Sequence, residues 1–293
     1  MSESVLILGA TSAIARATAA AFAARGDALY LASRDEEELR RIAADLRLRY
    51  GVEVRHGAFD AEATATHEVF FNSVLAAVPD LSGVVLAFGY LGDQLAARDF
   101  SAGAKVIAGN FTGAASILSH CANYFEADGQ ARFPHPNPDG TTNHSTKASK
   151  NDAQVAGYPP PAGEGANESL REIRVKRRGF IIGISSVAGD RGRQSNYVYG
   201  AAKGALSLYL QGLRNRLYPS GVRVITVKPG FVDTAMTYGL PGMFLVASPQ
   251  YIGERIVRAL ESSADVVYLP WFWRYIMLVI KIVPEPIFKR LKL

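Results

Sequence analysis

The chain has 293 residues, of which 48% are hydrophobic and 20% charged, and its formal net charge is +5. This composition excludes a disordered chain, a collagen or a coiled coil, and the length is sufficient for a large buried core. The single cysteine, Cys121, excludes an internal disulfide and a cysteine-based zinc site, and the five histidines lack the spacing of metal ligands. We therefore expect no bound metal.

The sequence shows neither a secretory signal nor a membrane-spanning run. The first apolar run ends at Gly9, too soon for a signal core, and no uninterrupted apolar stretch reaches the ~18 residues of a span. The modest positive charge fits an anionic substrate, an acidic membrane surface or simple solubility. The basic cluster at residues 174–178 lacks aromatic platforms, so no nucleic-acid partner is expected. These features predict a cytoplasmic protein.

Short apolar runs alternate with helical patterns along most of the chain. Apolar runs predict strands at residues 5–8, 28–32, 52–59, 83–88, 180–184 and 222–227. Helical spacing, as in Leu39, Ile42 and Leu46, predicts helices at residues 13–25, 35–50, 100–127, 197–218 and 249–262. This alternation predicts an α/β fold, a doubly wound, Rossmann-like parallel sheet of about seven strands in a single domain of residues 1–270.

A segment rich in proline, glycine and asparagine interrupts the alternation at residues 128–177, which predicts a flexible insertion. It joins a helix to a strand, and such connections lie at the amino-terminal edge of a parallel sheet. Ligands bind beyond the carboxyl edge. We therefore expect the insertion to lie far from the functional site.

A glycine turn joins the first expected strand to the first helix. A dinucleotide pyrophosphate binds the exposed amides of such a turn, at the positive end of the helix. The candidate cofactor residues here are Gly9, Thr11, Ser12, Ala13 and Ile14. Alanine stands at positions 13 and 15, where glycine is usual, so an ordinary strand–helix turn is the alternative.

The end of the second strand bears on the choice of cofactor. An acidic residue there accepts the ribose hydroxyl of NAD(H) and repels a 2′-phosphate. This chain has Ser33, which is neutral, and Arg34, whose guanidinium suits a phosphate. The pattern favours NADP(H) over NAD(H). Alternatively, Arg34 pairs with Asp35 or Glu38 on the helix surface.

A serine, a tyrosine and a lysine form the candidate catalytic group. Ser186 follows the fifth strand, and Tyr199 and Lys203 lie one helical turn apart on one helix face. Lowering a phenol pKa from about 10 to about 7 requires about 4 kcal/mol, which a neighbouring cation in a shielded site supplies. Tyr199 is then a general acid or base. Tyr197 points to another face of the helix and is the weaker candidate.

With these motifs the chain resembles the short-chain dehydrogenase/reductase family over about residues 4–270, less the insertion. The resemblance implies that Tyr199 donates a proton to a carbonyl while the nicotinamide supplies hydride. Ser186 would orient that carbonyl, and Lys203 would hold the nicotinamide ribose and lower the pKa of Tyr199. Asn110 matches the helix asparagine that links the lysine to a water chain. A homodimer or homotetramer, paired through helices 100–127 and 197–218, is also implied.

The resemblance extends to further cofactor positions. Asp60 matches an adenine-contacting aspartate. The nicotinamide loop is represented by Pro229, Gly230, Val232 and Thr234, and the turn after the fourth strand by Ala87, Phe88 and Gly89. The chain departs from the family in the missing turn glycines and in this last turn, which retains only its final glycine.

A narrower resemblance concerns the substrate. The runs at residues 87–93 and 185–193 and the tail are similar to decaprenylphosphoryl-2-keto-ribose reductases, which reduce a lipid-linked keto sugar in cell-wall synthesis. Arg191 and Arg193 lie between Ser186 and Tyr199, where two guanidinium groups could bind a substrate phosphodiester. Alternatively, one or both are solvated or bind a backbone carbonyl.

The tail, residues 271–293, is apolar and aromatic, with Arg274 and Lys281 on one helical face. It is too short and charged to span a bilayer but suits an amphipathic helix lying in an anionic membrane surface, at the inner face of the cell membrane. The alternative is a helix packed on the core or across a subunit contact. The apolar run at residues 239–246 suits a lid over the substrate.

Together these features predict an NAD(P)H-dependent reductase that transfers hydride to the ketone of an amphipathic or lipid-linked substrate. A polyprenyl-phosphate 2-ketopentose is the specific hypothesis. A 3-ketoacyl or steroid-type reductase is the alternative within the same class, and a catalytically idle nucleotide-binding member of the family is the alternative outside it.

Overall fold

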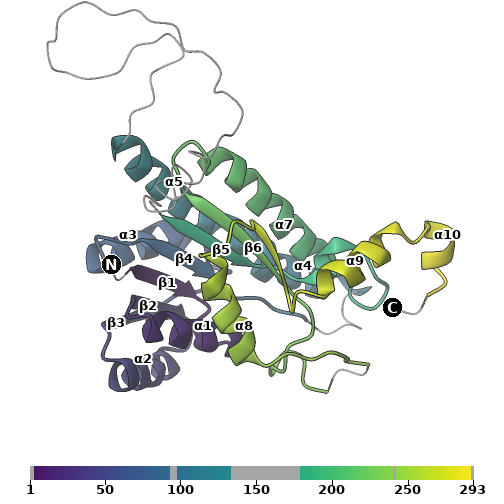
Figure 1. The fold of residues 1–293 in the computed structure, drawn as a ribbon, viewed down its shortest axis with the longest axis horizontal. Coiled ribbons are helices and arrows are strands. Elements are labelled where there is room, and N and C mark those ends of the chain that lie inside the picture. The colour runs from purple at the N-terminus through teal and green to yellow at the C-terminus, as the bar shows by residue number, and fades with distance from the viewer. Residues whose placement is uncertain (1–2, 93–97, 133–178, 240–241, 292–293) are drawn as a thin grey trace, which may run out of the picture.

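A computed structural model describes residues 3–92, 98–132, 179–239 and 242–291, without the side chains of 129–132. Seven parallel strands form one sheet in the order β3-β2-β1-β4-β5-β6-β7 (Figure 1). They are β1 Ser4–Leu8, β2 Ala28–Ser33, β3 Val54–Ala58, β4 Gly83–Leu86, β5 Phe180–Ile184, β6 Arg223–Pro229 and β7 Val266–Leu269. The Rossmann-like, doubly wound sheet predicted from the sequence is confirmed.

Helices join the strands and cover both faces of the sheet. Those before β5 are α1 Ala13–Ala24, α2 Glu36–Tyr50, α3 His67–Ala77, α4 Phe100–Ile107 and α5 Gly113–Arg132, with a 3₁₀ turn η1 at Thr64–Thr66. The later ones are the 3₁₀ turn η4 Val187–Asp190, α7 Tyr197–Leu217, α8 Pro249–Ala259, α9 Trp273–Ile282 and α10 Glu285–Phe288. Side chains that favour helix starts cap several of them: Ser12 caps α1, Asp35 caps α2, Asp99 caps α4, Ser186 caps η4 and Ser248 caps α8.

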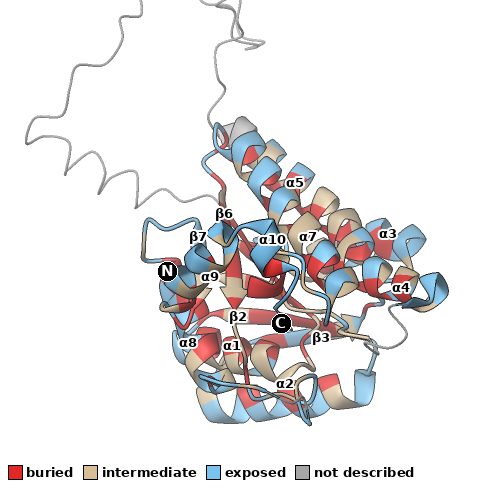
Figure 2. Ribbon diagram, turned by 90° about the vertical axis from the view of Figure 1, so that its right-hand side faces the viewer, coloured by how far each residue is buried: buried red, intermediate tan, exposed pale blue. Residues whose placement is uncertain are grey.

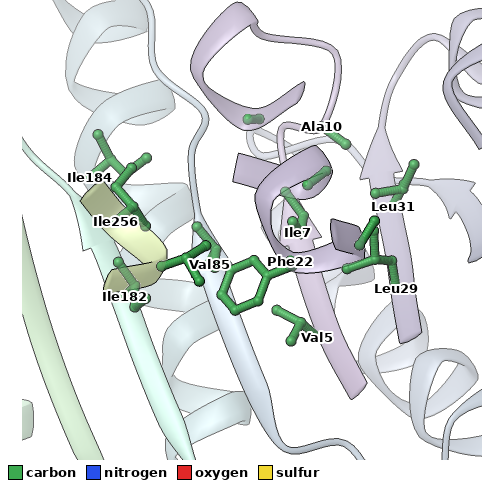
Figure 3. Packing of buried hydrophobic residues seen from close by; sticks show 14 of the residues in the cluster. Val5, Ile7, Ala10, Phe22, Leu29, Leu31, Val85, Ile182, Ile184 and Ile256 are labelled. Carbon is green, nitrogen blue, oxygen red and sulfur yellow. The ribbon is translucent and has the colours of Figure 1, made fainter. Parts of the chain in front are cut away.

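Alternation along the strands divides the core into two layers. Val5 and Ile7 of β1 face a cluster formed with α1, α2 and α8, whereas Leu6 and Leu8 face a cluster formed with α3, α5 and α7. Figure 2 shows buried residues concentrated in the sheet and on the inner sides of the helices. In Figure 3 the Phe22 ring of α1 lies over the strands, and it stacks on Phe180 at 5.9 Å between ring centroids.

The strand order places the functional crevice. β1 pairs with β2 on one side and β4 on the other. Successive strands are therefore added toward β3 on one side of β1 and toward β7 on the other, which makes the gap between β1 and β4 a topological switch point. Ligands of open parallel sheets bind beyond the carboxyl ends of the strands at such a switch point. The turns after Leu8 and Leu86 both lie there, which brings the glycine turn and the Gly89 turn together.

The structure differs from the predicted elements in several places. The helix predicted at residues 100–127 is interrupted by a π-helical turn, η3 Ala108–Thr112, and α5 continues to Arg132 because no proline occurs before Pro134. The predicted insertion at residues 128–177 therefore begins inside α5, and beyond Arg132 it lies outside the described residues. Helix α3 and strand β7 had no predicted range. β7 is a short edge strand with few buried positions.

The tail forms two short helices that lie beyond the end of the sheet (Figure 1). Trp273 and Met277 of α9 are buried against Val187 of η4, so one face of the tail packs on the domain. The opposite face is exposed and still apolar, with Leu278 54% and Val279 59% exposed. This contact corresponds to the alternative of a helix packed on the core. Within the described residues, no helix combines the length and apolar content needed to cross a membrane.

Candidate active site

The glycine turn after β1 has the geometry that the dinucleotide prediction requires. Gly9 has φ +82°, and a Cβ at this position would lie 2.7 Å from the backbone nitrogen of Phe88. Ser12 caps α1 by accepting a bond from the Ala15 amide at 3.2 Å. The remaining first-turn amides of α1, at Ala13 and Ile14, have no partner within the helix. They therefore leave a positive helix end open at the crevice.

The end of β2 is tied to this turn. Thr11 and Ser33 share a hydrogen bond between their hydroxyl oxygens at 2.9 Å. Arg34 is exposed, and the described residues include no ion-pair partner for it. The predicted alternative pairing is wrong, because Asp35 caps α2 and Glu38 pairs instead with Arg16 and Arg41.

Two other predicted cofactor positions lie near the same edge. Asp60, after β3, is exposed; its carboxylate accepts the Glu62 amide at 3.0 Å, and its carbonyl is bonded to His67 Nε2 at 2.9 Å. The Ala87 carbonyl accepts the Ser12 hydroxyl at 3.4 Å, so the turn after β4 contacts the glycine turn directly.

Ser186 and Tyr199 are brought together at the carboxyl edge of β5. The Ser186 hydroxyl caps η4 by accepting the Ala188 amide at 3.1 Å, and its interaction with the Tyr199 phenol lowers the pKa of that phenol. Its neighbour Ser185 points into the domain, where it donates to the Lys203 carbonyl at 2.8 Å. Tyr197 is 46% exposed. The structure therefore selects Ser186 over Ser185 and Tyr199 over Tyr197 as the pair at the crevice.

Lys203 and Asn110 converge on the backbone of Gly89. A Cβ at Gly89 would lie 2.8 Å from Asn110 Oδ1 and 3.1 Å from Lys203 Nζ, so the absence of a side chain at Gly89 lets both groups approach the backbone. The Lys203 ammonium donates to the Ile184 carbonyl at 3.1 Å and lies 5.9 Å from the centre of the Tyr199 ring. The lysine is thus placed between the asparagine and the tyrosine.

The π-helical turn is what orients Asn110. Its side-chain amide is fully buried and donates to the carbonyls of Tyr90 at 2.6 Å and Val106 at 2.8 Å. Its Oδ1 accepts the Tyr90 amide at 3.2 Å. Such turns change the direction of helical side chains and are frequent at functional sites. No sequence signal predicted the turn.

Burial controls the pKa values of both titratable groups. It raises the pKa of Tyr199 to about 12, with the hydrogen bond from Ser186 opposing the increase, and it lowers the pKa of Lys203 to about 8. In this structure burial outweighs the predicted lowering of the phenol pKa by Lys203, whose ammonium donates to the Ile184 carbonyl. The phenol is therefore protonated at neutral pH, as a proton donor must be.

The predicted nicotinamide loop follows β6. Gly230 donates its amide to the Leu269 carbonyl at 2.9 Å, and the indole of Trp273 leaves no room for a Cβ on Gly230. Val232 is buried and Thr234 is held by Thr237, whose hydroxyl also donates to the Val232 carbonyl. Pro229 ends the strand. The tail thus packs directly on this loop, which the sequence did not predict.

Arg191 does not face the crevice as a substrate ligand. Its guanidinium donates to the Ile280 and Val283 carbonyls, each at 2.6 Å, and pairs with Glu285 at 2.9 Å. The predicted phosphate contact is therefore wrong for Arg191. Its guanidinium binds carbonyls at the end of α9 that have no partner within the helix, which agrees with the alternative of a backbone carbonyl partner.

Arg193 differs from Arg191. Its Nε atom is buried and has no hydrogen-bond partner, and none of the described carboxylates forms an ion pair with it. Burial lowers the pKa of Arg193, opposed by the charge of Asp190. An unsatisfied buried N–H costs about 1–3 kcal/mol. Within the described residues, the Arg193 Nε therefore remains an unsatisfied buried donor.

A buried ionic cluster below the catalytic turn was missed at the sequence level. Asp190 pairs with Lys228 of β6 and accepts the Tyr268 hydroxyl of β7 at 2.7 Å. It holds the end of η4 to two strands. The sequence does contain a signal for this ion pair, because Lys228 is a charged residue next to the apolar run of β6.

The residues at the crevice fit a nicotinamide dinucleotide. An open helix end, a turn that excludes a side chain at Gly9, and the approach of Asn110 and Lys203 to Gly89 all lie along one edge. Alanine at position 13 sits in the first turn of a regular α1, so its methyl group does not disturb the turn. Among the described residues, no cluster of histidine, cysteine or carboxylate side chains could hold a metal.

The chain is a member of the short chain dehydrogenase family, which it matches over residues 3–132 and 164–241. It is therefore an oxidoreductase. An uncharacterized oxidoreductase of Mycobacterium tuberculosis is 29% identical over 98% of this chain and 96% of that protein. An uncharacterized oxidoreductase of Streptomyces coelicolor is 31% identical, over 99% of this chain and 96% of its own length.

Solved structures share the fold. A short chain dehydrogenase from Burkholderia cenocepacia, in complex with NADP, superposes with a TM-score of 0.70 at 18% sequence identity. The similarity covers 99% of this chain and 97% of that one. Agreement over nearly the whole length supports a single Rossmann-like unit.

Proposed function

We propose that this protein is an NADPH-dependent reductase that converts the ketone of an amphipathic substrate into an alcohol. The observation that carries the proposal is the meeting of Ser186, Tyr199 and Lys203 beside an open helix end. A serine hydroxyl, a protonated phenol and an amine at this edge suit proton transfer to a carbonyl oxygen.

The bound nicotinamide would supply the hydride. Tyr199 donates its proton to the carbonyl oxygen, which the Ser186 hydroxyl orients and polarises through a hydrogen bond. The phenolate that remains is stabilised by Ser186 and by the nearby charge of Lys203. The π-helical turn fixes Asn110, whose side-chain amide lies close to the Lys203 ammonium beside Gly89.

A panel of ketones, monitored by NADPH consumption, tests the proposal. We include polyprenyl-phosphate keto sugars, 3-ketoacyl thioesters and steroids. Turnover of any ketone at a rate dependent on enzyme concentration supports a reductase. Failure of both NADPH and NADH to bind below millimolar concentration would instead favour an idle member of the family.

Arg34 supports the preference for NADP(H), because it is exposed beside Ser33 and has no ion-pair partner in the part of the chain that the structure describes. Replacing Arg34 with alanine should raise the NADPH dissociation constant by about tenfold or more, since charged hydrogen bonds contribute about 1.5–3 kcal/mol. The NADH constant should change by less than about twofold. Fluorescence titration measures both. Arg40→Ala, an exposed arginine of α2, is the control, and equal weakening of both cofactors would contradict the assignment.

Arg193 supports an anionic substrate, because its buried Nε lacks a partner. We propose that it contacts a phosphate carried by the substrate, and a polyprenyl-phosphate 2-ketopentose is the specific candidate. The apolar lid beside the site would accommodate the lipid: Phe244, 51% exposed, contacts the Phe231 ring edge-to-face and the Trp273 ring in a tilted arrangement. A 3-ketoacyl or steroid substrate would use the same apolar surface without Arg193, and the ketone panel separates these cases.

We also propose that the protein acts in the cytoplasm, peripherally at the inner face of the membrane, through its tail. The exposed face of α9 carries Leu278, Val279 and Ile282, with the cations Arg274 and Lys281 exposed on the same helix. Apolar side chains flanked by cations suit an anionic lipid surface. The lid contributes Leu245, which is also exposed.

Substitution of Leu278 and Val279 by glutamate should abolish flotation with vesicles that contain phosphatidylglycerol, because both charges would enter the apolar layer. Wild type should float with these vesicles and less with pure phosphatidylcholine. Leu48→Glu, at an 88% exposed leucine of α2, is the matched control and should float like wild type. Equal flotation of all three proteins would contradict the membrane proposal. Surface substitutions are preferable to truncation, because α9 also contributes buried residues.

A homodimer or homotetramer is proposed from the family resemblance. Large apolar side chains remain exposed on the helices concerned, including Phe100 of α4 and Leu208 of α7. Their exposure supports pairing through this side of the domain.

A further inference from the structure

The C-terminal segment forms part of the wall around the catalytic residues. Trp273 and Met277 share a hydrophobic cluster with Val187, which directly follows Ser186. On its other side Trp273 packs on Gly230 and meets the Phe231 ring edge-to-face, at 5.7 Å between ring centroids. The tail therefore contacts both the catalytic turn and the loop after β6.

Arg191 is the polar link between the two parts. Its guanidinium donates to three carbonyls, those of Ile280, Lys281 and Val283, at 2.6, 3.2 and 2.6 Å. These belong to the end of α9, where helix geometry leaves carbonyls without partners. The guanidinium carbon also lies 3.7 Å from the centre of the Phe288 ring. Both terminal nitrogens of Arg191 therefore bind the tail, Nη1 through these carbonyls and Nη2 through Glu285.

The position of Arg191 in the chain makes this link relevant to the site. The connection from η4 to α7, residues 191–196, runs from the end of the Ser186 turn to the start of the helix that carries Tyr199. The preceding residue, Asp190, is fixed to β6 and β7. Beyond it, Gln194 adds only a 3.4 Å bond to the Leu291 carbonyl, again in the tail.

We propose that Arg191 is a positioning residue, which fastens the connection between Ser186 and Tyr199 to the C-terminal helices. The tail then serves as a scaffold for the catalytic group in addition to any role at a membrane. The catalytic part of this inference rests on the proposed reductase function. A displacement of about 1 Å of a catalytic group lowers a rate by up to about 100-fold, so loss of the link should be measurable.

Arg191→Ala should lower kcat roughly 10- to 100-fold on a neutral ketone. Its KM and the NADPH dissociation constant should change by less than about threefold, because the residue does not touch substrate. Amide hydrogen exchange in residues 187–196 should become faster. Arg191→Lys keeps the positive charge but loses the planar guanidinium, so its kcat should lie between those of wild type and Arg191→Ala. Arg290→Ala, an exposed arginine of the same segment, is the control and should behave like wild type.

Phe288→Leu weakens the link from the tail side and provides a second variant if Arg191→Ala does not fold. It should also accelerate exchange in residues 187–196. The proposal is overturned if exchange in this segment is unchanged in the folded variants, or if Arg191→Ala alters only the KM for anionic ketones, which would make Arg191 a substrate ligand. If wild type reduces no ketone, the proposed function fails, and the exchange measurements alone decide whether Arg191 orders the connection.

Discussion

Replacement of Tyr199 by phenylalanine is expected to lower kcat for ketone reduction by roughly 10²- to 10⁴-fold, the contribution typical of a positioned general acid. The phenylalanine ring fills the same space, so the helix and the crevice should persist. Removing the hydroxyl deletes the titratable proton donor next to Ser186. Steady-state turnover with NADPH and a neutral ketone measures the loss.

NADPH affinity should remain within about threefold of wild type in this variant, because no interaction with the charged parts of the cofactor is removed. Tyr197→Phe is the matched control, two positions earlier and 46% exposed, and it should retain full activity. Retained turnover in Tyr199→Phe, or an equal loss in both variants, would reject the assigned role.

Replacement of Lys203 by methionine is expected to separate activity from stability. Turnover should fall by at least about 10²-fold, because the phenolate loses its neighbouring cation. The nucleotide-free protein should become more stable by about 2 kcal/mol. Burial lowers the pKa of Lys203 from 10.5 to about 8, which makes the charged lysine destabilise the folded protein by roughly 3 kcal/mol at neutral pH. Methionine removes this contribution but also removes the hydrogen bond to the Ile184 carbonyl, which stabilises the folded protein by about 1 kcal/mol.

The pH dependence follows from the same group. Between pH about 8 and 10.5 the unfolded chain binds more protons at Lys203 than the folded chain, so wild-type stability gains from this residue as the pH rises through that window. Lys203→Met should lack this gain, whereas Lys105→Met, at an exposed lysine of α4, should retain it. Denaturant unfolding at several pH values measures the effect. A destabilised methionine variant would contradict the account.

The parallel sheet and the catalytic group could be predicted because their signals are local. Apolar runs such as residues 5–8 and 180–184 define buried strands without knowledge of their partners. The spacing of Tyr199 and Lys203 places both on one helix face whatever the surroundings. Strand β7 has few buried positions and was therefore not assigned a range, although seven strands were expected.

The environment of these residues could not be predicted in the same way. Whether Arg191 binds a substrate phosphate or helix carbonyls depends on where a tail about ninety residues away comes to rest. The pKa of Tyr199 likewise depends on burial and on the direction of the Lys203 ammonium, neither of which follows from spacing. The π-helical turn at Asn110 arises inside a sequence that is compatible with an uninterrupted helix.

Product analysis with C4-deuterated NADPH tests the central assignment most directly. If the crevice binds the nicotinamide next to Ser186, Tyr199 and Lys203, the alcohol formed from a reactive ketone should carry deuterium on its carbinol carbon, detectable by mass spectrometry. Tyr199→Phe should form little of this product. Absence of a labelled alcohol with every ketone tested, in a preparation that binds NADPH, would contradict the assignment of this protein as a ketone reductase.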